Sequence, residues 1–320
     1  MESPLRLGVS ACLLGHPVRY DGGHKHDRWI TGELGKYVTF VPVCPEAEAG
    51  FGIPREAMRL VGDPAEPKLV TIQTGRDMTP AMTEWASTRL EDLARQDLCG
   101  FIFKSRSPSS GMERVKVYPE KGGPAVNKGV GIFAAAFMKR FPLLPVEEDG
   151  RLNDARLREN FIERIFVLRR WRDTAKAITD GAGVRELIAF QASHKLLLMA
   201  HSPDNARLMG KLVAAATREN LPATLAQYEA LLLETTARLG SVRKHVNVLQ
   251  HMAGYFRKLI SPDERQELAE VIEEYRQGLT PLIVPLTLVN HHVRKQGVAY
   301  LAGQAYLKPH PVELKLRNYY

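Results

Sequence analysis

Two cysteines and a carboxylate follow apolar runs near the N-terminus. Residues 5–10 form an apolar run that leads to Cys12, and residues 38–43 lead directly into Cys44. Glu46 comes two residues later, after a proline that fixes the local backbone and aims the carboxylate. A thiolate is a nucleophile and a metal ligand, and a carboxylate beside a metal centre can act as general base for water. Two buried cysteines and a surface acid are the alternative.

A third apolar run, residues 100–103, leads into a loop rich in hydroxyls and cations. The loop, residues 104–114, reads K-S-R-S-P-S-S-G-M-E-R. Hydroxyls and backbone N–H groups on a tight turn can hold an anion or the polar edge of a ligand, although an ordinary surface turn is also possible. Ligands bind at the carboxyl ends of strands in an open α/β sheet, so we expect the three loops to form the walls of one site.

The third cysteine has a different setting. Cys99 precedes the run at 100–103 and should lie at the opposite end of that strand from the loop. Five extended residues span roughly 16 Å, which is too far for Cys99 to share a small cluster with Cys12. No C-x-x-C pair is present, which argues against a zinc ribbon. We expect Cys99 to be a packing residue.

Strand-like and helix-like runs alternate over the first half of the chain. Further strands are expected at 69–72 and 115–118, and helices at about 79–96 and 129–141. This alternation favours a parallel sheet. Two prolines, then the acidic run 147–149 and a glycine, indicate a boundary at 142–151.

The second half is almost entirely helical in pattern. We therefore predict an α/β, Rossmann-like N-terminal domain with a parallel-type sheet over residues 1–150, followed by an all-α domain over residues 151–320. The expected helices span 154–172, 184–200, 205–217, 224–239, 242–259, 262–278 and 281–293.

The composition is that of a globular protein, with 44% hydrophobic and 25% charged residues in a chain of 320. Neither a signal peptide nor an apolar run of membrane-spanning length is apparent. We expect a cytoplasmic protein without a membrane partner or an obligate protein partner. The three cysteines do not make a disulfide framework.

The excess of positive over negative charge is confined to the second half of the chain. Residues 1–150 contain 19 Lys and Arg against 19 Asp and Glu, which leaves 25 against 17 and the whole net charge of +8 for the rest. A nucleic acid is the simplest partner for such a half, and a solvated basic surface is the alternative. His194 and His201 are expected on a basic, imidazole-bearing strip of one helix. The candidate RNA-binding cations are Lys195, Arg243, Lys244, Arg257, Lys258, Arg294 and Lys295.

Several stretches together resemble a known family. S-A-C-L-L-G (10–15), V-R-Y-D-G-G (18–23), V-P-V-C-P-E (41–46) and K-S-R-S-P-S-S-G (104–111) are similar to motifs of the TudS-like desulfurases, iron–sulfur enzymes that act on thiouracil. K-H-V-N-V-L-Q-H-M-A-G-Y-F-R-K (244–258) and P-L-T-L-V-N-H-H (285–292) resemble the YbgA-type helical domain. The combination resembles fused desulfidases that act on 4-thiouridine in tRNA.

The resemblance implies a 4Fe–4S cluster with three protein ligands and one open iron, which accepts the sulfur of a thiolated uracil base while water replaces it without net redox. Cys12 and Cys44 match two ligand positions. The third ligand position, a cysteine in the family motif, is Ser110 here. A serine hydroxyl is a harder, less acidic ligand than a thiol, so we expect weakened cluster retention.

The remaining site residues follow from the same motifs. Glu46 and Ser107 are the candidates for activating water or orienting the substrate. The candidate substrate-binding residues are Arg19, Tyr20, Lys104 and Ser109. The expected activity is conversion of 4-thiouridine in tRNA to uridine. The alternatives are a desulfurase for free thiouracil-type bases, or a non-catalytic RNA-binding protein whose cluster site is lost at Ser110.

Overall fold

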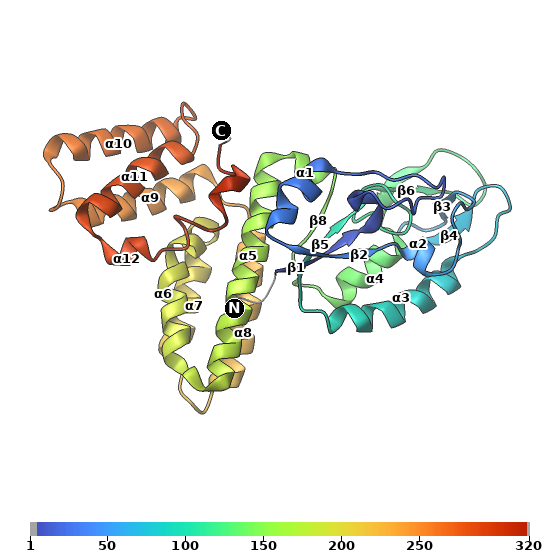
Figure 1. The fold of residues 1–320 in the computed structure, drawn as a ribbon, viewed down its shortest axis with the longest axis horizontal. Helices are drawn as coiled ribbons and strands as arrows, with labels where there is room; N and C mark the ends of the chain where they lie inside the picture. Colours follow the sequence, from blue (N-terminus) through green and yellow to red (C-terminus); the bar gives the residue numbers. More distant parts are fainter. Residues whose placement is uncertain (1–4, 319–320) are drawn as a thin grey trace. The chain divides into compact units, whose positions relative to one another are not determined.

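A computed structural model describes residues 5–318, which fall into two compact units (Figure 1). Along the sequence, the boundary between the two units lies between Asn153 and Asp154, three residues beyond the expected boundary at 150. The N-terminal unit combines strands and helices, whereas the C-terminal unit is helical. Both fold classes agree with the prediction from the sequence.

The first sheet of the N-terminal unit is entirely parallel, as predicted. Its strands are β1 (Arg6–Ser10), β2 (Thr39–Val43), β5 (Leu98–Phe103) and β8 (Val146–Glu148), in the order β2-β1-β5-β8. Every neighbouring pair runs in the same direction. The segments after β1, β2 and β5 therefore leave the sheet at one edge, because parallel strands share their carboxyl ends.

Aromatic packing holds this sheet against two helices. All six residues of β5 are buried, and the rings of Phe101 and Phe103 contact Phe133 and Phe137. These last two belong to α4 (Ile132–Arg140), which packs beside α3 (Thr79–Ala94) in the same core (Figure 1). Gly8 makes room for β5, since a Cβ there would lie 2.2 Å from the Phe101 ring.

A second four-stranded sheet was not predicted. It contains β3 (Met58–Val61), β4 (Lys68–Thr71), β6 (Val115–Tyr118) and β7 (Val126–Gly129), in the order β4-β3-β6-β7. The expected strands at 69–72 and 115–118 thus exist, but they belong to this mixed sheet, where two of the three pairings are antiparallel. β3 and β7 are short and partly exposed, so their sequences carry no strong apolar signal.

The acidic run before residue 150 is a strand and not a linker. Glu147 and Glu148 lie in β8 and are buried. Their charge is accommodated by specific partners: Arg151 donates to Glu147, and the backbone N–H of Met112 donates to Glu148. Burial nevertheless raises the pKa of Glu148. Such partners cannot be read from a local acidic pattern, so the sequence did not indicate a strand within the predicted boundary segment 142–151.

The helical unit follows the predicted pattern closely. Short polar residues begin many of the helices, with side chains that accept backbone N–H groups: Asp154 for α5, Ser202 for α7, Ser241 for α9 and Ser261 for α10. No helix of residues 5–318 is both long and apolar enough to cross a membrane. The helices are α5 (Ala155–Ala177), α6 (Val184–His201), α7 (Pro203–Ala214), α8 (Leu221–Ala237), α9 (Val242–Phe256), α10 (Pro262–Arg276), α11 (Ile283–Gln296) and α12 (Ala299–Ala302).

The loop after β5 rests on the start of α4 at a glycine. The Gly131 N–H donates to Gly111 O (2.8 Å), and a Cβ on Gly131 would lie 2.5–2.7 Å from backbone atoms of Ser109 and Ser110. We expect Gly131→Ala to lower the free energy of unfolding by about 1–3 kcal/mol, because backbone atoms must move to admit the methyl group. Urea unfolding measures this change.

Gly32→Ala is the matched control. Gly32 is the last residue of α1 (Arg28–Gly32), and a Cβ added there would have no other atom within 4 Å. Alanine at this position should be neutral or stabilising by roughly 0.5–1 kcal/mol. Equal stability of the two variants would contradict the close packing of the loop on α4.

Candidate active site

A cavity of about 400 Å³ opens at the carboxyl edge of the parallel sheet. This volume is within the range of small-molecule sites. The three loops expected to form one site do so. The side chains predicted for the N-terminal half all line this cavity: Cys12, Arg19, Tyr20, Cys44, Glu46, Lys104, Ser107, Ser109 and Ser110.

The two cysteines reach the cavity from short helical turns. Cys12 lies in the 3-10 helix η1 (Ala11–Leu14) directly after β1, and Cys44 precedes α2 (Pro45–Glu48) directly after β2. Burial raises the pKa of the Cys12 thiol to about 11, with a further increase from Cys44. Burial also raises the pKa of Cys44, whose Sγ donates to Val18 O at 3.6 Å. The protein environment alone therefore keeps both thiols protonated at neutral pH.

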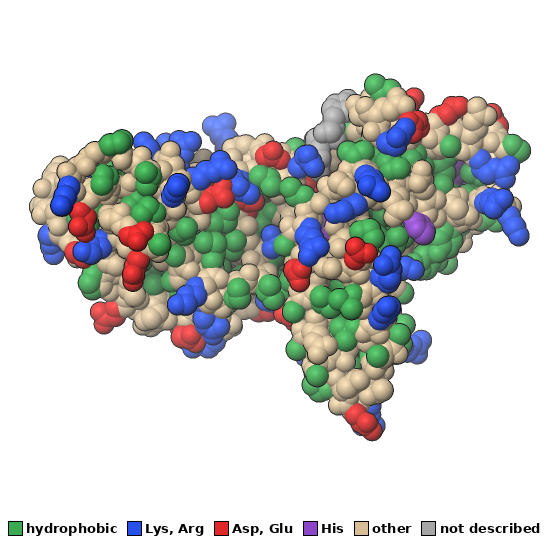
Figure 2. All heavy atoms as spheres, turned by 180° about the vertical axis from the view of Figure 1, so that it is seen from behind, with side chains coloured by type: hydrophobic (Ala, Val, Ile, Leu, Met, Phe, Trp, Pro, Cys, Tyr) green, Lys and Arg blue, Asp and Glu red, His purple; other side chains and the backbone are tan. Residues whose placement is uncertain are grey.

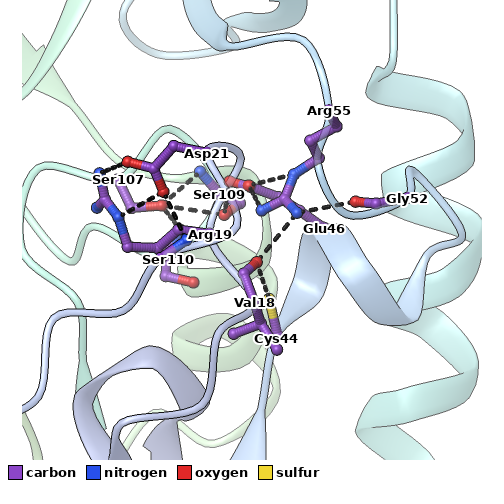
Figure 3. Close-up of polar contacts among 11 residues, drawn as sticks. Val18, Arg19, Asp21, Cys44, Glu46, Gly52, Arg55, Ser107, Ser109 and Ser110 are labelled. Atoms are coloured by element: carbon purple, nitrogen blue, oxygen red, sulfur yellow. Dashed lines mark hydrogen bonds and ion pairs between the residues drawn. The ribbon is translucent and has the colours of Figure 1, made fainter.

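A chain of hydrogen bonds connects three of the predicted residues (Figure 3). Ser109 Oγ donates to Glu46 Oε1 at 2.8 Å and lies 3.0 Å from Ser107 Oγ. The Ser109 hydroxyl has a single proton and donates it to Glu46 Oε1. The hydrogen bond between the two serines is therefore donated by the Ser107 hydroxyl to Ser109 Oγ. Ser107 Oγ in turn accepts the backbone N–H groups of Ser109 and Ser110. The geometry provides a path for a proton from Ser107 to the Glu46 carboxylate.

Arg55 is a site residue that the sequence analysis missed. Its side chain is 4% exposed and contacts Glu46 Oε2 through Nε (2.9 Å) and Nη2. Its Nη1 donates to the carbonyl oxygens of Val18 and Gly52, both at 3.0 Å (Figure 3). Only the position of Arg55 after the Gly-Ile-Pro turn at 52–54 marks it in the sequence. The pair fixes one Glu46 oxygen and leaves the other to Ser109.

The predicted substrate-binding cations each have an acidic partner. Lys104 Nζ contacts Asp149 Oδ2 at 2.9 Å, and Arg19 contacts Asp21 at 3.2 Å. The Arg19 guanidinium also lies 5.3 Å from the centre of the Tyr20 ring, which is half exposed at the cavity wall. These contacts hold the Lys104 and Arg19 side chains in place at the wall of the cavity.

The donor atoms at the cavity decide whether an iron–sulfur cluster fits. Ser110 is buried, and its hydroxyl has no hydrogen-bond partner among residues 5–318, so its oxygen is available as a ligand beside the two thiols. Cys99 is fully buried within β5 and is a packing residue; the strand begins at Leu98, so Cys99 lies in it and not before it. Within the described chain, no three His, Cys, Asp or Glu side chains form a metal-binding group. The residues fit a cluster held by two thiolates and a hydroxyl, a weaker donor set than three thiolates.

The predicted RNA-binding cations occupy several places on the helical unit. Lys195, Arg243 and Lys244 line one groove between α6, α7 and α9. Arg257 and Lys258 follow the end of α9. Arg294 and Lys295 lie in the last turn of α11, where Lys295 pairs with Glu264 at 2.8 Å.

The expected imidazole strip on α6 is wrong, because both histidines face the interior. His194 is buried, and burial together with Arg170 lowers its pKa to about 3, so the ring is neutral. His201 is buried against Glu163 and the carbonyl oxygen of Arg238. The surface of α6 therefore presents Lys195 without histidine neighbours from the same helix.

The buried pair of Arg55 and Glu46 predicts a non-additive effect on stability. Arg55→Met should lower the free energy of unfolding by about 3–5 kcal/mol, because it leaves the Glu46 carboxylate without its cation. Arg55→Met combined with Glu46→Leu should recover part of that loss. Urea unfolding of the two single variants and the double variant measures the coupling. Additive losses would show that the pair is not a unit.

Comparisons with known proteins divide the chain in the same way. The model of the family described as 2-thiouracil desulfurase matches residues 7–149, and that of a protein family of unknown function, DUF1722, matches residues 195–311. The 4Fe-4S-dependent thiouracil desulfidase TudS is similar to this chain at 28% identity, over 47% of this chain and 94% of that protein, with a TM-score of 0.37.

Two curated relatives each correspond to one half. The uncharacterized protein YbgA of Escherichia coli (strain K12) is 34% identical over 169 residues, which are 52% of this chain and 98% of YbgA. The uncharacterized protein YbbK of Bacillus subtilis (strain 168) is 30% identical over 151 residues, which are 46% of this chain and 97% of YbbK. The chain therefore belongs to the family of 2-thiouracil desulfurase domains, in a form fused to a YbgA-type domain.

Proposed function

We propose that this protein removes sulfur from thiolated uracil in tRNA and converts 4-thiouridine to uridine. The single observation that supports it most is the cavity in which two thiols lie beside the Glu46–Ser109–Ser107 chain. Membership of the desulfurase family supports the reaction class. The basic excess of the second half supports a nucleic acid as the substrate carrier.

The proposed reaction is a hydrolytic exchange at one carbon. The oxygen of water forms a bond to C4 of the base, the bond from C4 to sulfur breaks, and the sulfur leaves as sulfide. The two protons of water leave with the sulfide, and no electron is gained or lost. The reaction therefore needs a base for water and an acceptor for sulfur.

Glu46 is the general base in this proposal. Arg55 holds one of its oxygens, and the other receives the Ser109 hydroxyl. A proton taken from water near Ser107 can pass through the Ser107 and Ser109 hydroxyls to the Glu46 carboxylate. Ser109 acts in this proposal through its neighbours, as a positioning residue.

Cys12, Cys44 and the Ser110 oxygen would hold a 4Fe–4S cluster, with one iron left open. When bound, such a cluster supplies a thiophilic site for the departing sulfur. Because burial raises the pKa of the Cys12 thiol, Cys12 would have to lose its proton to serve as a thiolate ligand.

Replacement of the base gives the test of the proposed function. The protein is reconstituted anaerobically with iron and sulfide, and loss of the 4-thiouridine absorbance from tRNA is followed. We expect Glu46→Gln to lower turnover by about 10²–10⁴-fold, because an amide cannot take the proton. Ser107→Ala should lower it by interrupting the path. Lys128→Gln, in the exposed strand β7, is the control that removes a charged group away from the cavity.

Two results would reject parts of this proposal. If the wild-type protein releases no sulfur from tRNA but does from free thiouracil, the substrate is the free base. If it releases none from either and still binds tRNA, the chain is a binding protein, in accordance with the serine at the third ligand position.

Ser110→Cys tests the ligand assignment. We expect the variant to retain more iron after gel filtration than the wild type, because a thiolate is a better cluster ligand than a hydroxyl. Iron content per chain and the charge-transfer absorbance measure retention. Ser105→Cys, at another position on the cavity wall, controls for an added thiol. Equal iron retention by wild type and Ser110→Cys would contradict the assignment.

A further inference from the structure

Both ends of the hydroxyl-rich loop lie beside one short strand. The loop, residues 104–114, follows β5 directly and carries Ser107 of the hydrogen-bond chain. β8 pairs with β5 in parallel, and the register places Phe103, the last residue of β5, opposite Glu148. The acidic run at the end of β8 therefore lies next to the point where the loop begins.

Asp149 holds the beginning of the loop. Its Oδ1 accepts the backbone N–H of Ser105 at 2.7 Å, and its Oδ2 accepts Lys104 Nζ at 2.9 Å. The same ammonium also donates to Ser105 Oγ (3.0 Å) and Ser105 O (3.3 Å), so each of its three protons has an acceptor. The backbone N–H of Lys104 donates to Ser10 Oγ at the end of β1 (2.9 Å). One carboxylate thus fixes both the backbone and the cation at the first two residues of the loop.

Glu148 holds the end of the loop. Its Oε1 accepts the backbone N–H of Met112 at 2.6 Å and that of Glu113 at 3.4 Å. Arg151 adds a further connection, because its Nη1 donates to Glu113 (2.8 Å) and its Nε donates to Glu147 (2.6 Å). Acidic side chains are visible on the surface of both units in Figure 2, whereas Glu147 and Glu148 are buried. Because burying a carboxylate without hydrogen-bond partners is costly, these contacts bind the loop to β8.

The backbone of the loop has a conformation that needs such support. Arg106 and Arg114 have φ angles of 60° and 54°, in the left-handed region that residues other than glycine rarely adopt. Each of them directly follows a residue whose backbone N–H is held by one of the two carboxylates: Arg106 follows Ser105, and Arg114 follows Glu113. Strained residues of this kind persist where the surrounding structure fixes them. The two carboxylates are placed to do so.

The hydroxyls of the proposed proton path lie between the two held ends. Ser107 Oγ accepts the backbone N–H groups of Ser109 and Ser110, and Ser107 O accepts the N–H of Gly111 at 2.8 Å. A shift of either end of the loop would move this turn relative to Glu46. A displacement of about 1 Å at a reacting group can lower a rate by about 100-fold.

We propose that Asp149 and Glu148 are positioning residues for the desulfuration reaction. They hold the loop 104–114 at both ends and thereby keep the Ser107 hydroxyl in the hydrogen-bond chain that leads to Glu46. Neither carboxylate lines the cavity, so both act through the loop and not on the substrate. The inference rests on the function proposed above and adds the residues that support it from β8.

The test replaces each carboxylate by the amide of the same shape. In Asp149→Asn and Glu148→Gln, an amide group opposes N–H donors that the carboxylate accepts. We expect each variant to lower kcat for 4-thiouridine in tRNA by about 10–100-fold and to leave KM unchanged, because the hydroxyls move while the cavity walls after β1 and β2 stay in place. Asp149→Glu keeps the charge and should retain more of kcat than Asp149→Asn. Glu84→Gln, on the exposed face of α3, is the control and should match the wild type.

Hydrogen exchange provides a measurement that needs neither a cluster nor turnover. Mass spectrometry of the peptide that covers residues 104–114 reports the protection of the Ser105, Met112 and Glu113 amides in the full-length protein. We expect exchange in this peptide to be at least about tenfold faster in both variants, with α3 unchanged. Fast exchange of α3 as well would show that a variant has unfolded, and the other variant then decides.

The two measurements together separate this inference from the proposed activity. Faster exchange of the loop with a lower kcat at unchanged KM supports the assignment. If the wild type is active and the variants match its kcat, or raise KM alone, the assignment is overturned, as it is if the loop exchanges at the wild-type rate. If the wild type has no turnover and the loop of the variants exchanges faster, the proposed function fails and the hold of Asp149 and Glu148 on the loop stands.

Discussion

The buried pair of Arg55 and Glu46 fixes the arrangement of the cavity. The Arg55 guanidinium binds the carboxylate and the carbonyl oxygens of Val18 and Gly52. Glu46 then reaches the loop after β5 through Ser109. One cation thus connects the segment after β1, the start of α2 and the hydroxyl-rich loop. A buried carboxylate without this partner would be costly, so the cavity depends on the pair as a unit.

The place of the site could be predicted from the sequence because a general rule governs it. Cys12, Cys44 and Ser107 follow strands of one parallel sheet, and parallel strands place their following loops at one edge. Arg55 could not be predicted, since its partners come from three separate segments and no local pattern marks them. The second sheet and β8 were missed for a related reason. Their strands are short, and β8 buries two glutamates whose partners, Arg151 and the Met112 N–H, are set by tertiary structure.

The helical unit shows the same division between local and tertiary information. The helical pattern of the sequence predicted the helices to within a few residues at most ends, as for α9 and α10. His194 and His201 were predicted on a basic surface of α6 but are buried. Histidine occurs on both solvent-exposed and buried faces of helices, so the sequence alone does not decide between them. The predicted cations are distributed over several surfaces. The groove lined by Lys195 and Arg243 is also lined by Lys211, which no motif had indicated.

We propose that water replaces sulfur at C4 of the uracil ring and that Glu46 acts as the general base for that water. The most direct measurement is turnover of 4-thiouridine-containing tRNA in water enriched in heavy oxygen, followed by mass spectrometry of the nucleosides and assay of sulfide. We predict one heavy oxygen in each new uridine and one sulfide released per uridine formed, with both products reduced together in Glu46→Gln. Uridine without the heavy isotope, or sulfide release unchanged by Glu46→Gln, would contradict hydrolytic exchange with Glu46 as the general base.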